Sequence, residues 1–372
     1  MVGTMALVVV LSVFNGFDDL IQSLFSTFDP EIKITPAKGK VFSTDNEKIK
    51  QVYNFPGVDF AAETLEENVL IKFEDKQYPG MIKGVSDNFS SVTGIDTMMV
   101  EGKFILKESN RPYAIIGQGL AYYLSYSPGY SSPLSIYLIK RTGKVTLNVN
   151  EAIKQKLIFT SGVFAIEQSY DVKYLIIPLD VARDLLDYTT EVSALEIKLK
   201  TGVNIKTVQQ ELMVLLGKDF NVKNRYQQNE AFYKIMKTEK WAIFFILLLI
   251  LIIASFNVIG SLAMLVIDKK EDINTLKSMG ASHKLIKRIF LAEGWMISFF
   301  GVITGIILGV FICWLQIYFG FVQLKGSGSF VIDAYPVMIK FSDVIMIFVA
   351  VNIIGFLASA VPVKFMVKKY HL

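Results

Sequence analysis

The chain has 372 residues and a formal net charge of +4; 52% of its residues are hydrophobic and only 19% are charged. This balance excludes an ordinary soluble protein and favours membrane spans joined to a folded globular part. The basic residues do not gather in one patch with aromatic residues between them, so we expect no nucleic acid partner. The single cysteine, Cys313, excludes an intramolecular disulfide and a multi-cysteine metal site.

The first seventeen residues are apolar and contain no ionisable side chain. As a helix they cover about 25 Å, which is less than the hydrocarbon layer of about 30 Å. No basic leading region or small-residue cleavage site indicates a signal peptide. We therefore expect the outer part of a first span whose beginning this sequence lacks. The helical pattern continues to just before Pro30, so residues 1–28 are predicted to form this partial transmembrane helix and a stalk.

Residues 29–226 have a different pattern, with short alternating or apolar runs between Gly, Pro and Asn residues. Runs such as EIKITP, NVLIKFE, YPGMIKGV, YAIIG, LSIYLI, KLIFTSGVF and ALEIKLK predict strands, and helices are predicted at about residues 119–125, 179–188 and 205–217. We expect an α+β domain, and its length favours two lobes. Its acidic run ETLEEN, Glu63–Asn68, could be a carboxylate pair or cation site, but a solvated strand edge or turn is favoured.

Residues 227–267 are predicted to form a stalk that continues into the second span, because helical periodicity leads without Gly or Pro into the uncharged run Trp241–Ile267. A charged loop, residues 268–288, separates it from a third span at residues 289–319. Residues 320–342 form a connection, residues 343–363 a fourth span, and residues 364–372 a tail. In the third span, glycines recur every four residues on one face, at Gly301, Gly305 and Gly309. Helix packing is favoured there over a pore or ligand role.

The basic residues near the spans predict the topology. Six lie between Lys269 and Arg288, and Lys364, Lys368 and Lys369 follow the last span. The charged loop and the C-terminus are therefore expected in the cytoplasm. The domain at residues 29–226 and the connection at residues 320–342 are then expected outside it.

The sequence lacks the motifs that would supply chemistry or energy. It has no GxxxxGK[ST] loop for nucleotide phosphates, no HExxH pattern and no GxSxG elbow. We therefore expect no catalytic residue, no cofactor and no metal in this chain. No charged residue lies near the middle of a predicted span, although ion-coupled transporters usually keep one. The energy for any work is expected from another protein.

The run SFNVIGSLAMLVIDKKEDINTLKSMGASHKLIKRIFLAEG, Ser255–Gly294, resembles the signature of the FtsX-like ABC transporter permeases, most closely their LolC/LolE lipoprotein-releasing branch. The segments VLSVFNGF, IIGQGLAYYL, FTSGVF and DAYPV also resemble parts of that family. The N-terminus lacks the family's cytoplasmic lead. Val145–Lys156 shows no obvious long hairpin like the carrier-binding hook of LolC, which leaves LolC-like and LolE-like roles open.

The resemblance implies an integral membrane protein of four transmembrane helices with a MacB-like periplasmic core between the first two, located in the bacterial inner membrane. Its partners would be cytoplasmic ATPase subunits, which bind the ATP and magnesium, and a second permease that is identical or homologous. The substrate would be a lipoprotein extracted from the outer leaflet and passed to a periplasmic carrier, in contact with membrane lipid.

The resemblance also places the coupling to the ATPase within residues 271–284. An apolar stripe, a charged rim and a turn are expected at Glu271, Asp272, Ile273, Leu276, Lys277, Met279, Gly280, Ser282 and Lys284. The alternative is an amphipathic helix that lies on the inner leaflet. Acyl chains would enter a cleft between the outer ends of the first two spans, with candidate residues Phe14, Phe17, Phe244, Phe245 and Leu248. Ordinary packing or contact with lipid is the alternative for each.

Two other functions remain open. The first is a MacB-type efflux permease that works by mechanotransmission with an outer-membrane duct, although that branch normally carries its ATPase on the same chain. The second is an FtsX-type signalling permease that activates a cell-wall hydrolase. The long domain between the first two spans and the motif at Ser255–Gly294 favour lipoprotein release.

Overall fold

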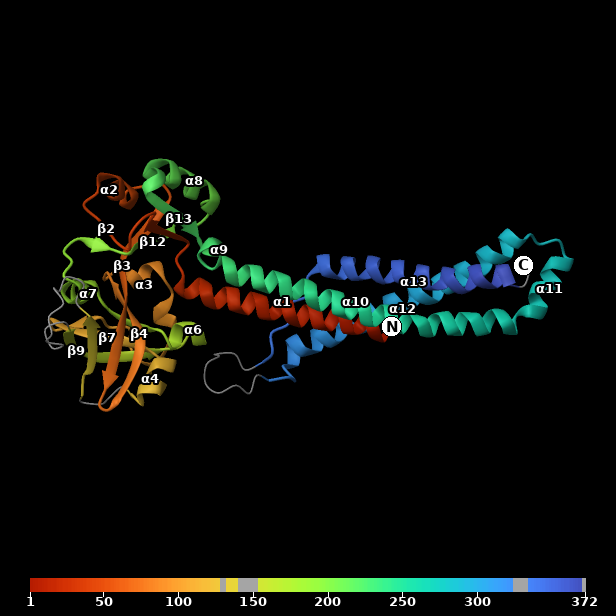
Figure 1. Ribbon diagram of the computed structural model, residues 1–372, viewed down its shortest axis with the longest axis horizontal. Coiled ribbons are helices and arrows are strands. Elements are labelled where there is room, and N and C mark those ends of the chain that lie inside the picture. The colour runs from red at the N-terminus through yellow and green to blue at the C-terminus, as the bar shows by residue number, and fades with distance from the viewer. Residues whose placement is uncertain (128–131, 140–152, 324–333, 370–372) are drawn as a thin grey trace. The chain divides into compact units, whose positions relative to one another are not determined.

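The computed structural model describes residues 1–127, 132–139, 153–323 and 334–369 (Figure 1). Most of the segment at residues 145–156, the KGSGS stretch and His371 lie outside these ranges, so the expectations for them are not addressed by the structure. The chain divides into two compact units. We call Met1–Ile21, Phe232–Lys325 and Ile332–Leu372 the helical unit, and Gln22–Ala231 the sheet domain.

Within the described residues, four helices are long and apolar enough to cross a membrane, which is the number that the sequence predicted. They are α1 (Val2–Phe28), α10 (Glu230–Asp268), α12 (His283–Phe319) and α13 (Phe341–Lys369). The short helix α11 (Lys270–Ser278) lies between α10 and α12. No proline interrupts the 39 residues of α10, which therefore form one helix of about 58 Å. The expected stalk and second span are thus one continuous element.

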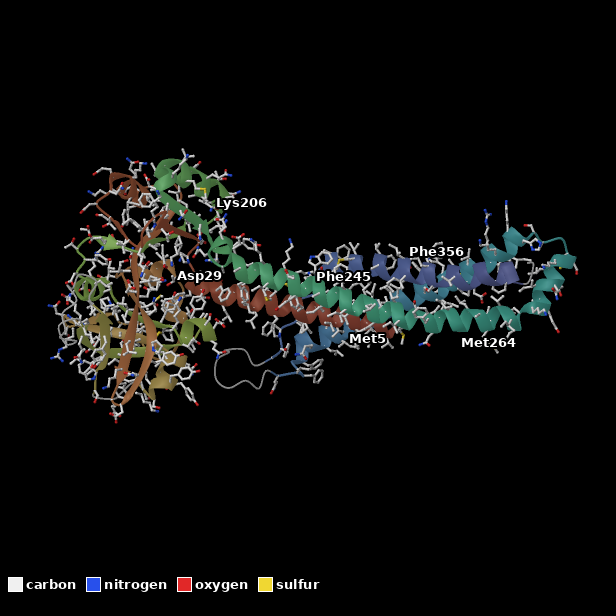
Figure 2. All side chains as sticks on the ribbon, in the orientation of Figure 1. Met5, Asp29, Lys206, Phe245, Met264 and Phe356 are labelled. Atoms are coloured by element: carbon white, nitrogen blue, oxygen red, sulfur yellow. The ribbon has the colours of Figure 1, made fainter. Side chains whose placement is uncertain are left out.

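The helical unit is apolar both inside and outside. Its buried core joins side chains from all four long helices: Leu7, Val8 and Leu11 of α1, Phe244 of α10, Val302 of α12, and Ile347 and Val351 of α13. Large apolar side chains also cover the outer surface, among them Phe245, Met264 and Phe356 (Figure 2). Such a surface is unfavourable in water and suits hydrocarbon.

The strands of the sheet domain alternate with short helices. They are β1 (Ile32–Pro36), β2 (Phe42–Ser43), β3 (Val58–Phe73), β4 (Lys76–Val85), β5 (Met99–Gly102), β6 (Lys107–Glu108), β7 (Arg111–Gly117), β8 (Leu134–Ile139), β9 (Ile153–Phe164), β10 (Tyr174–Pro178), β11 (Glu191–Val192), β12 (Ala194–Leu199) and β13 (Phe220–Asn224). The helices are α2 (Glu47–Tyr53), α3 (Phe89–Val92), α4 (Gln118–Leu124), α6 (Gln168–Asp171), α7 (Leu179–Leu186), α8 (Ile205–Leu216) and α9 (Arg225–Gln228). All seven runs expected as strands, and the three expected helices, are present.

Among the described residues, eleven strands form one mixed sheet with the main order β13-β1-β12-β3-β4-β10-β7-β9-β5. β10 is parallel to β4, β7 is parallel to β9, and the other neighbours along this order are antiparallel. Two hydrophobic cores share the sheet: one lies around β1, β12, α2 and α8, and the other lies under α4 and α7. The α+β class predicted for this region is confirmed.

The acidic run Glu63–Asn68 corrects one expectation. It lies within β3, where Glu63 and Thr64 pair with β12 and Thr64–Asn68 pair with β4, so it is part of a strand and not a turn. The Glu63 carboxylate accepts a hydrogen bond from Arg183 at 2.8 Å and another from the Tyr53 hydroxyl at 2.7 Å. The charges are neutralised by partners that are distant in sequence, which a local pattern does not reveal.

Candidate functional site

The loop that contains α11 divides the expected apolar stripe in two. Ile273 is 2% exposed and packs with Val266 of α10 and with Ile286 and Phe290 of α12. Leu276 is 37% exposed and Met279 is 79% exposed. Ile273 therefore fixes α11 to its neighbouring helices. The apolar surface that remains available to a partner consists of Leu276 and Met279.

The expected charged rim of α11 lies in solvent. Glu271 and Asp272 stand in the first turn and Lys277 in the last, which is the arrangement that the helix dipole favours. Lys269 contacts Asp272 at 2.9 Å, and water and salt screen such an exposed pair. Lys284 is also exposed. These charges contribute little to the fold and remain available for an electrostatic contact.

The turn from α11 into α12 is built by Gly280 and Ser282. Gly280 has a φ of +91°, and its N–H donates to Lys277 O while Ala281 N–H donates to Leu276 O. Both bonds belong to the Schellman motif, which favours glycine at this position. Ser282 then caps α12 by accepting a hydrogen bond from Leu285 N–H at 3.4 Å. The turn is specified by local chemistry and sets where α12 begins.

The glycine face of α12 lies against α1. A Cβ at Gly309 would lie 2.8 Å from Val8 Cβ, and one at Gly305 would lie 2.7 Å from Thr4 Cβ. At Gly301 the nearest atom, Met1 N, would be 3.6 Å away. Gly305 and Gly309 thus allow the two helices to approach at a distance that any side chain would prevent.

The structure does not bring the five candidate cleft residues together. Phe244 is buried in the core of the helical unit and Leu248 packs against that core, whereas Phe245 points outward (Figure 2). Phe14 and Phe17 are half-buried on α1, and the Phe17 ring lies 6.2 Å from that of Tyr335. The residues therefore divide between packing, lipid contact and the segment before α13.

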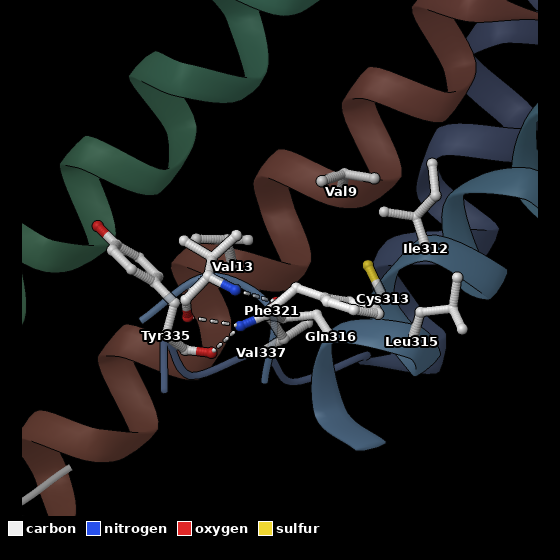
Figure 3. A pocket seen from close by; sticks show the side chains of 10 residues that line it. Val9, Val13, Ile312, Cys313, Leu315, Gln316, Phe321, Tyr335 and Val337 are labelled. Atoms are coloured by element: carbon white, nitrogen blue, oxygen red, sulfur yellow. Dashed lines mark hydrogen bonds between the residues drawn. The ribbon is translucent and has the colours of Figure 1, made fainter. Parts of the chain in front are cut away.

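An apolar pocket of about 450 Å³ lies between α1 and α12 (Figure 3). Its lining residues are Val9, Val13, Ile312, Cys313, Leu315, Gln316, Phe321, Val322, Tyr335 and Val337. The Gln316 amide donates to Val322 O at 2.9 Å and to Tyr335 O at 3.3 Å, and it accepts from Val322 N–H at 3.0 Å. This polar side chain is thus engaged by backbone. The other residues that line the pocket are mainly apolar and suit a hydrocarbon chain.

A polar cluster that the sequence did not predict ties three helices together. Lys240 of α10 donates to both Asp343 oxygens of α13, at 2.8 and 3.0 Å, and to Asn15 Oδ1 of α1 at 3.0 Å. Asn15 Nδ2 donates to Asp343 Oδ2 at 2.6 Å. Each of these residues lies near an end of an apolar run, and this position was the only feature of the sequence that could have indicated the cluster.

Comparisons with known proteins cover both units. The MacB-like periplasmic core domain model matches residues 1–214, and the FtsX-like permease C-terminal model matches residues 244–370.

Among the described residues, groups of three or more His, Cys, Asp or Glu side chains that could hold a metal are absent.

Several relatives match nearly the full chain. The lipoprotein-releasing system transmembrane protein LolC of Neisseria meningitidis serogroup B is 27% identical over 377 residues, which cover 97% of this chain and 88% of that protein. LolE of Haemophilus influenzae is 24% identical, with the same two coverages. An uncharacterized ABC transporter permease of Methanocaldococcus jannaschii is 24% identical over 83% of this chain and 76% of its own length.

Among solved structures, the periplasmic region of MacB from Actinobacillus actinomycetemcomitans covers 58% of this chain and 98% of its own. Its TM-score is 0.41 and its sequence identity is 11%.

Proposed function

The chain belongs to the ABC transporter permeases that join a MacB-like periplasmic core domain to an FtsX-like C-terminal region, and on this premise we propose that it releases lipoproteins from the outer leaflet of the bacterial inner membrane. It is the non-catalytic membrane subunit. A partner ATPase binds ATP and magnesium, a second permease of the same or a homologous kind completes the membrane part, and a periplasmic carrier receives the lipoprotein.

The observation that supports this function is the extent of the similarity to lipoprotein-releasing proteins. It covers 97% of the chain and so includes both the helical unit and the sheet domain. A shared helical region alone would fit any FtsX-like permease. The basic residues around α11 favour a cytoplasmic position for this loop, which leaves the sheet domain in the periplasm.

The ATPase binds at the loop that contains α11. Leu276 and Met279 offer the exposed apolar contact, while Glu271, Asp272, Lys277 and Lys284 surround it with charge. The Gly280–Ser282 turn connects this contact directly to α12. A push on α11 therefore acts on α12 and on the helices that pack against it.

The pocket between α1 and α12 binds one acyl chain of the lipoprotein. Its apolar lining, with the Gln316 amide engaged by backbone, matches a hydrocarbon chain and offers little to a head group. Pockets of about 300–1,000 Å³ hold small ligands, and this one is within that range. Phe245, exposed on α10, contacts the surrounding lipid.

Purification of the tagged chain from mild detergent, followed by mass spectrometry, tests the function. We expect ATPase and permease chains together with lipoproteins and a periplasmic carrier. An outer-membrane duct in their place would indicate efflux of the MacB type, and a cell-wall hydrolase would indicate FtsX-type signalling. In the reconstituted complex, addition of ATP must drive the transfer of lipoprotein to the carrier.

Leu315→Trp tests the pocket because it fills the space that an acyl chain needs. We expect release to fall by about tenfold, the scale on which lost burial of a few methylenes reduces binding. Leu308→Trp is the matched control, since Leu308 lies on the same helix, faces outward and does not line the pocket. Equal release by both variants would contradict the assignment of the pocket.

A further inference from the structure

The last turn of α1 ends in the interior of the sheet domain. The Phe28 ring is 1% exposed. Four aromatic rings surround it, with centroids 4.8–6.4 Å away. We call these rings the Phe28 socket: Phe89 of α3, Phe164 of β9, Tyr170 of α6 and Tyr174 of β10. Because the rings come from four separate elements, a movement of Phe28 would disturb all four.

A buried ammonium group lies at the base of the socket. Lys83 of β4 is 2% exposed, and its Nζ lies 4.4 Å from the Phe28 ring centroid and 5.1 Å from that of Phe89. Both distances fall in the range of cation–π attraction. The same Nζ donates to Glu196 Oε1 at 2.8 Å, and Glu196 has no exposed surface. A buried lysine is stable only when such partners replace its water.

Two further charges complete a neutral row across four strands that are neighbours in the sheet. Lys33 of β1 is opposite Glu196 of β12, and Glu66 of β3 is opposite Lys83. Lys33 contacts Glu66 at 3.2 Å and Glu196 at 3.5 Å. Burial raises the pKa of Glu66, but Lys33 and Lys83 outweigh it and hold that pKa at about 2. Glu66 therefore stays ionised between the two lysines, and the ion pairs of the row form the base of the socket.

A second set of bonds holds the residues just outside the socket. The Tyr170 hydroxyl donates to both Asp29 carboxylate oxygens, at 3.0 and 3.1 Å, and the Asn229 amide also donates to this carboxylate. Arg225 donates to Ser26 O at 3.2 Å and to Asp29 O at 3.1 Å. Asn229 directly precedes α10, so the end of α1 is bound to the beginning of α10.

We propose that the Phe28 socket, together with the Asp29–Asn229–Arg225 contacts, is a rigid joint through which α1 and α10 move the sheet domain during lipoprotein release. This inference rests on the proposed function. Phe28 and Asn229 are positioning residues: they touch no substrate, but they determine whether movement of the helices reaches the domain. Pro30 follows α1 directly after the joint, so the helix cannot continue further. The contacts must transmit the force.

The test uses the complete complex in lipid nanodiscs and measures ATP hydrolysis and lipoprotein transfer to the carrier in the same sample. For Phe28→Ala and for Asn229→Ala, we expect transfer per ATP to fall by about tenfold while ATP hydrolysis stays within about twofold, as expected for loss of coupling between distant sites. The two variants change opposite ends of the domain's sequence, so a folding defect in one leaves the other informative.

Leu212→Ala is the control for a purely structural effect. Leu212 is fully buried in the core around β1, β12 and α8 and is not part of the socket. We expect this variant to lower thermal stability and keep transfer per ATP. Equal loss of transfer in Leu212→Ala, or unchanged transfer in both joint variants, would overturn the joint.

Hydrogen exchange separates the joint from the proposed function. In the wild-type complex, we expect ATP to change the exchange of amides in the sheet domain, and we expect Phe28→Ala to abolish this change. If the wild type hydrolyses ATP but releases no lipoprotein, the proposed function fails. An unchanged ATP response in Phe28→Ala would refute the joint independently of that outcome.

Discussion

In the helical unit, α1 meets α12 where two glycines remove side-chain volume, whereas the sheet domain packs large side chains between its sheet and helices. The environment explains the difference. Lipid is as apolar as a leucine side chain, so close approach and a few polar contacts must hold membrane helices together. In water, burial of apolar surface supplies the stability. Added side-chain volume should therefore destabilise the contact between α1 and α12, whereas lost side-chain volume should destabilise the sheet domain.

The largest effect is expected on binding of the ATPase at the loop that contains α11, where the substituted side chains are exposed and contribute little to folding stability. Replacing both Leu276 and Met279 with Asp should abolish binding of the ATPase, because charge replaces the exposed apolar contact. Pull-down of the ATPase subunit measures this. Leu285→Asp, at an exposed position of α12, should retain binding. If the double variant still binds, the coupling residues lie elsewhere.

In the sheet domain, Leu212→Ala should reduce the free energy of unfolding by about 2–5 kcal/mol because it leaves a cavity in a close-packed core. Val214 lies on the same helix and is 84% exposed, so Val214→Ala should change stability by about 0.5 kcal/mol or less. Denaturant titration of the full chain, followed by a probe in the sheet domain, compares them. Similar losses would mean that the core of this domain is not well packed.

The pH dependence of the sheet domain should come partly from Asp171. This side chain is 1% exposed and accepts a hydrogen bond from Ile166 N–H at 2.8 Å. Burial raises the pKa of Asp171 from 3.8 to about 7, although the Ile166 N–H opposes the rise. Between these values the folded state holds a proton that the unfolded state has lost, so stability falls as pH rises through this window.

Asp171→Asn removes that titration while it keeps an acceptor for Ile166 N–H. From pH 5 to pH 8, the wild type should lose about 2–3 kcal/mol more stability than the variant. Thermal unfolding of the full chain across this range provides the measurement. Parallel pH profiles for the two proteins would show that Asp171 is ionised throughout.

The smallest change in stability is expected when side-chain volume is added in the helical unit. Gly309→Val should destabilise it by about 1–3 kcal/mol, because the new side chain collides with Val8. A Cβ added at Gly260 on α10 would meet no atom within 4 Å, so Gly260→Val provides a control with the same added volume. Thermal unfolding in nanodiscs compares the two. If Gly309→Val does not lower the thermal stability, α1 and α12 can move apart without loss of stability.

Sequence patterns predicted the elements better than their contacts. Periodicity and uninterrupted apolar runs revealed the four long helices, and alternation revealed β1, β3 and β12. The glycine spacing indicated a close helix contact but could not name α1 as the partner. The i, i+3, i+6 pattern of Ile273, Leu276 and Met279 is present, yet the hairpin of α10 and α12 buries the first of them.

The row of four charges, of which Lys83 and Glu196 are buried, could not be recognised in the sequence for a physical reason. Lys33, Glu66, Lys83 and Glu196 each stand in a strand where a charged residue normally faces solvent. Only strand pairing brings them together: β3 and β4 are neighbours in the chain, whereas β1 and β12 are far apart in it. Local alternation shows which face a residue occupies but not what covers that face.

The position of β1 has a consequence for the order of assembly. This strand is among the first parts of the sheet domain to be synthesised, yet its two neighbours, β12 and β13, are among the last. Until Asn224 has been made, β1 has an unpaired edge, and such edges promote aggregation. Because α10 begins only a few residues later, the domain completes its sheet as the second span is about to enter the membrane.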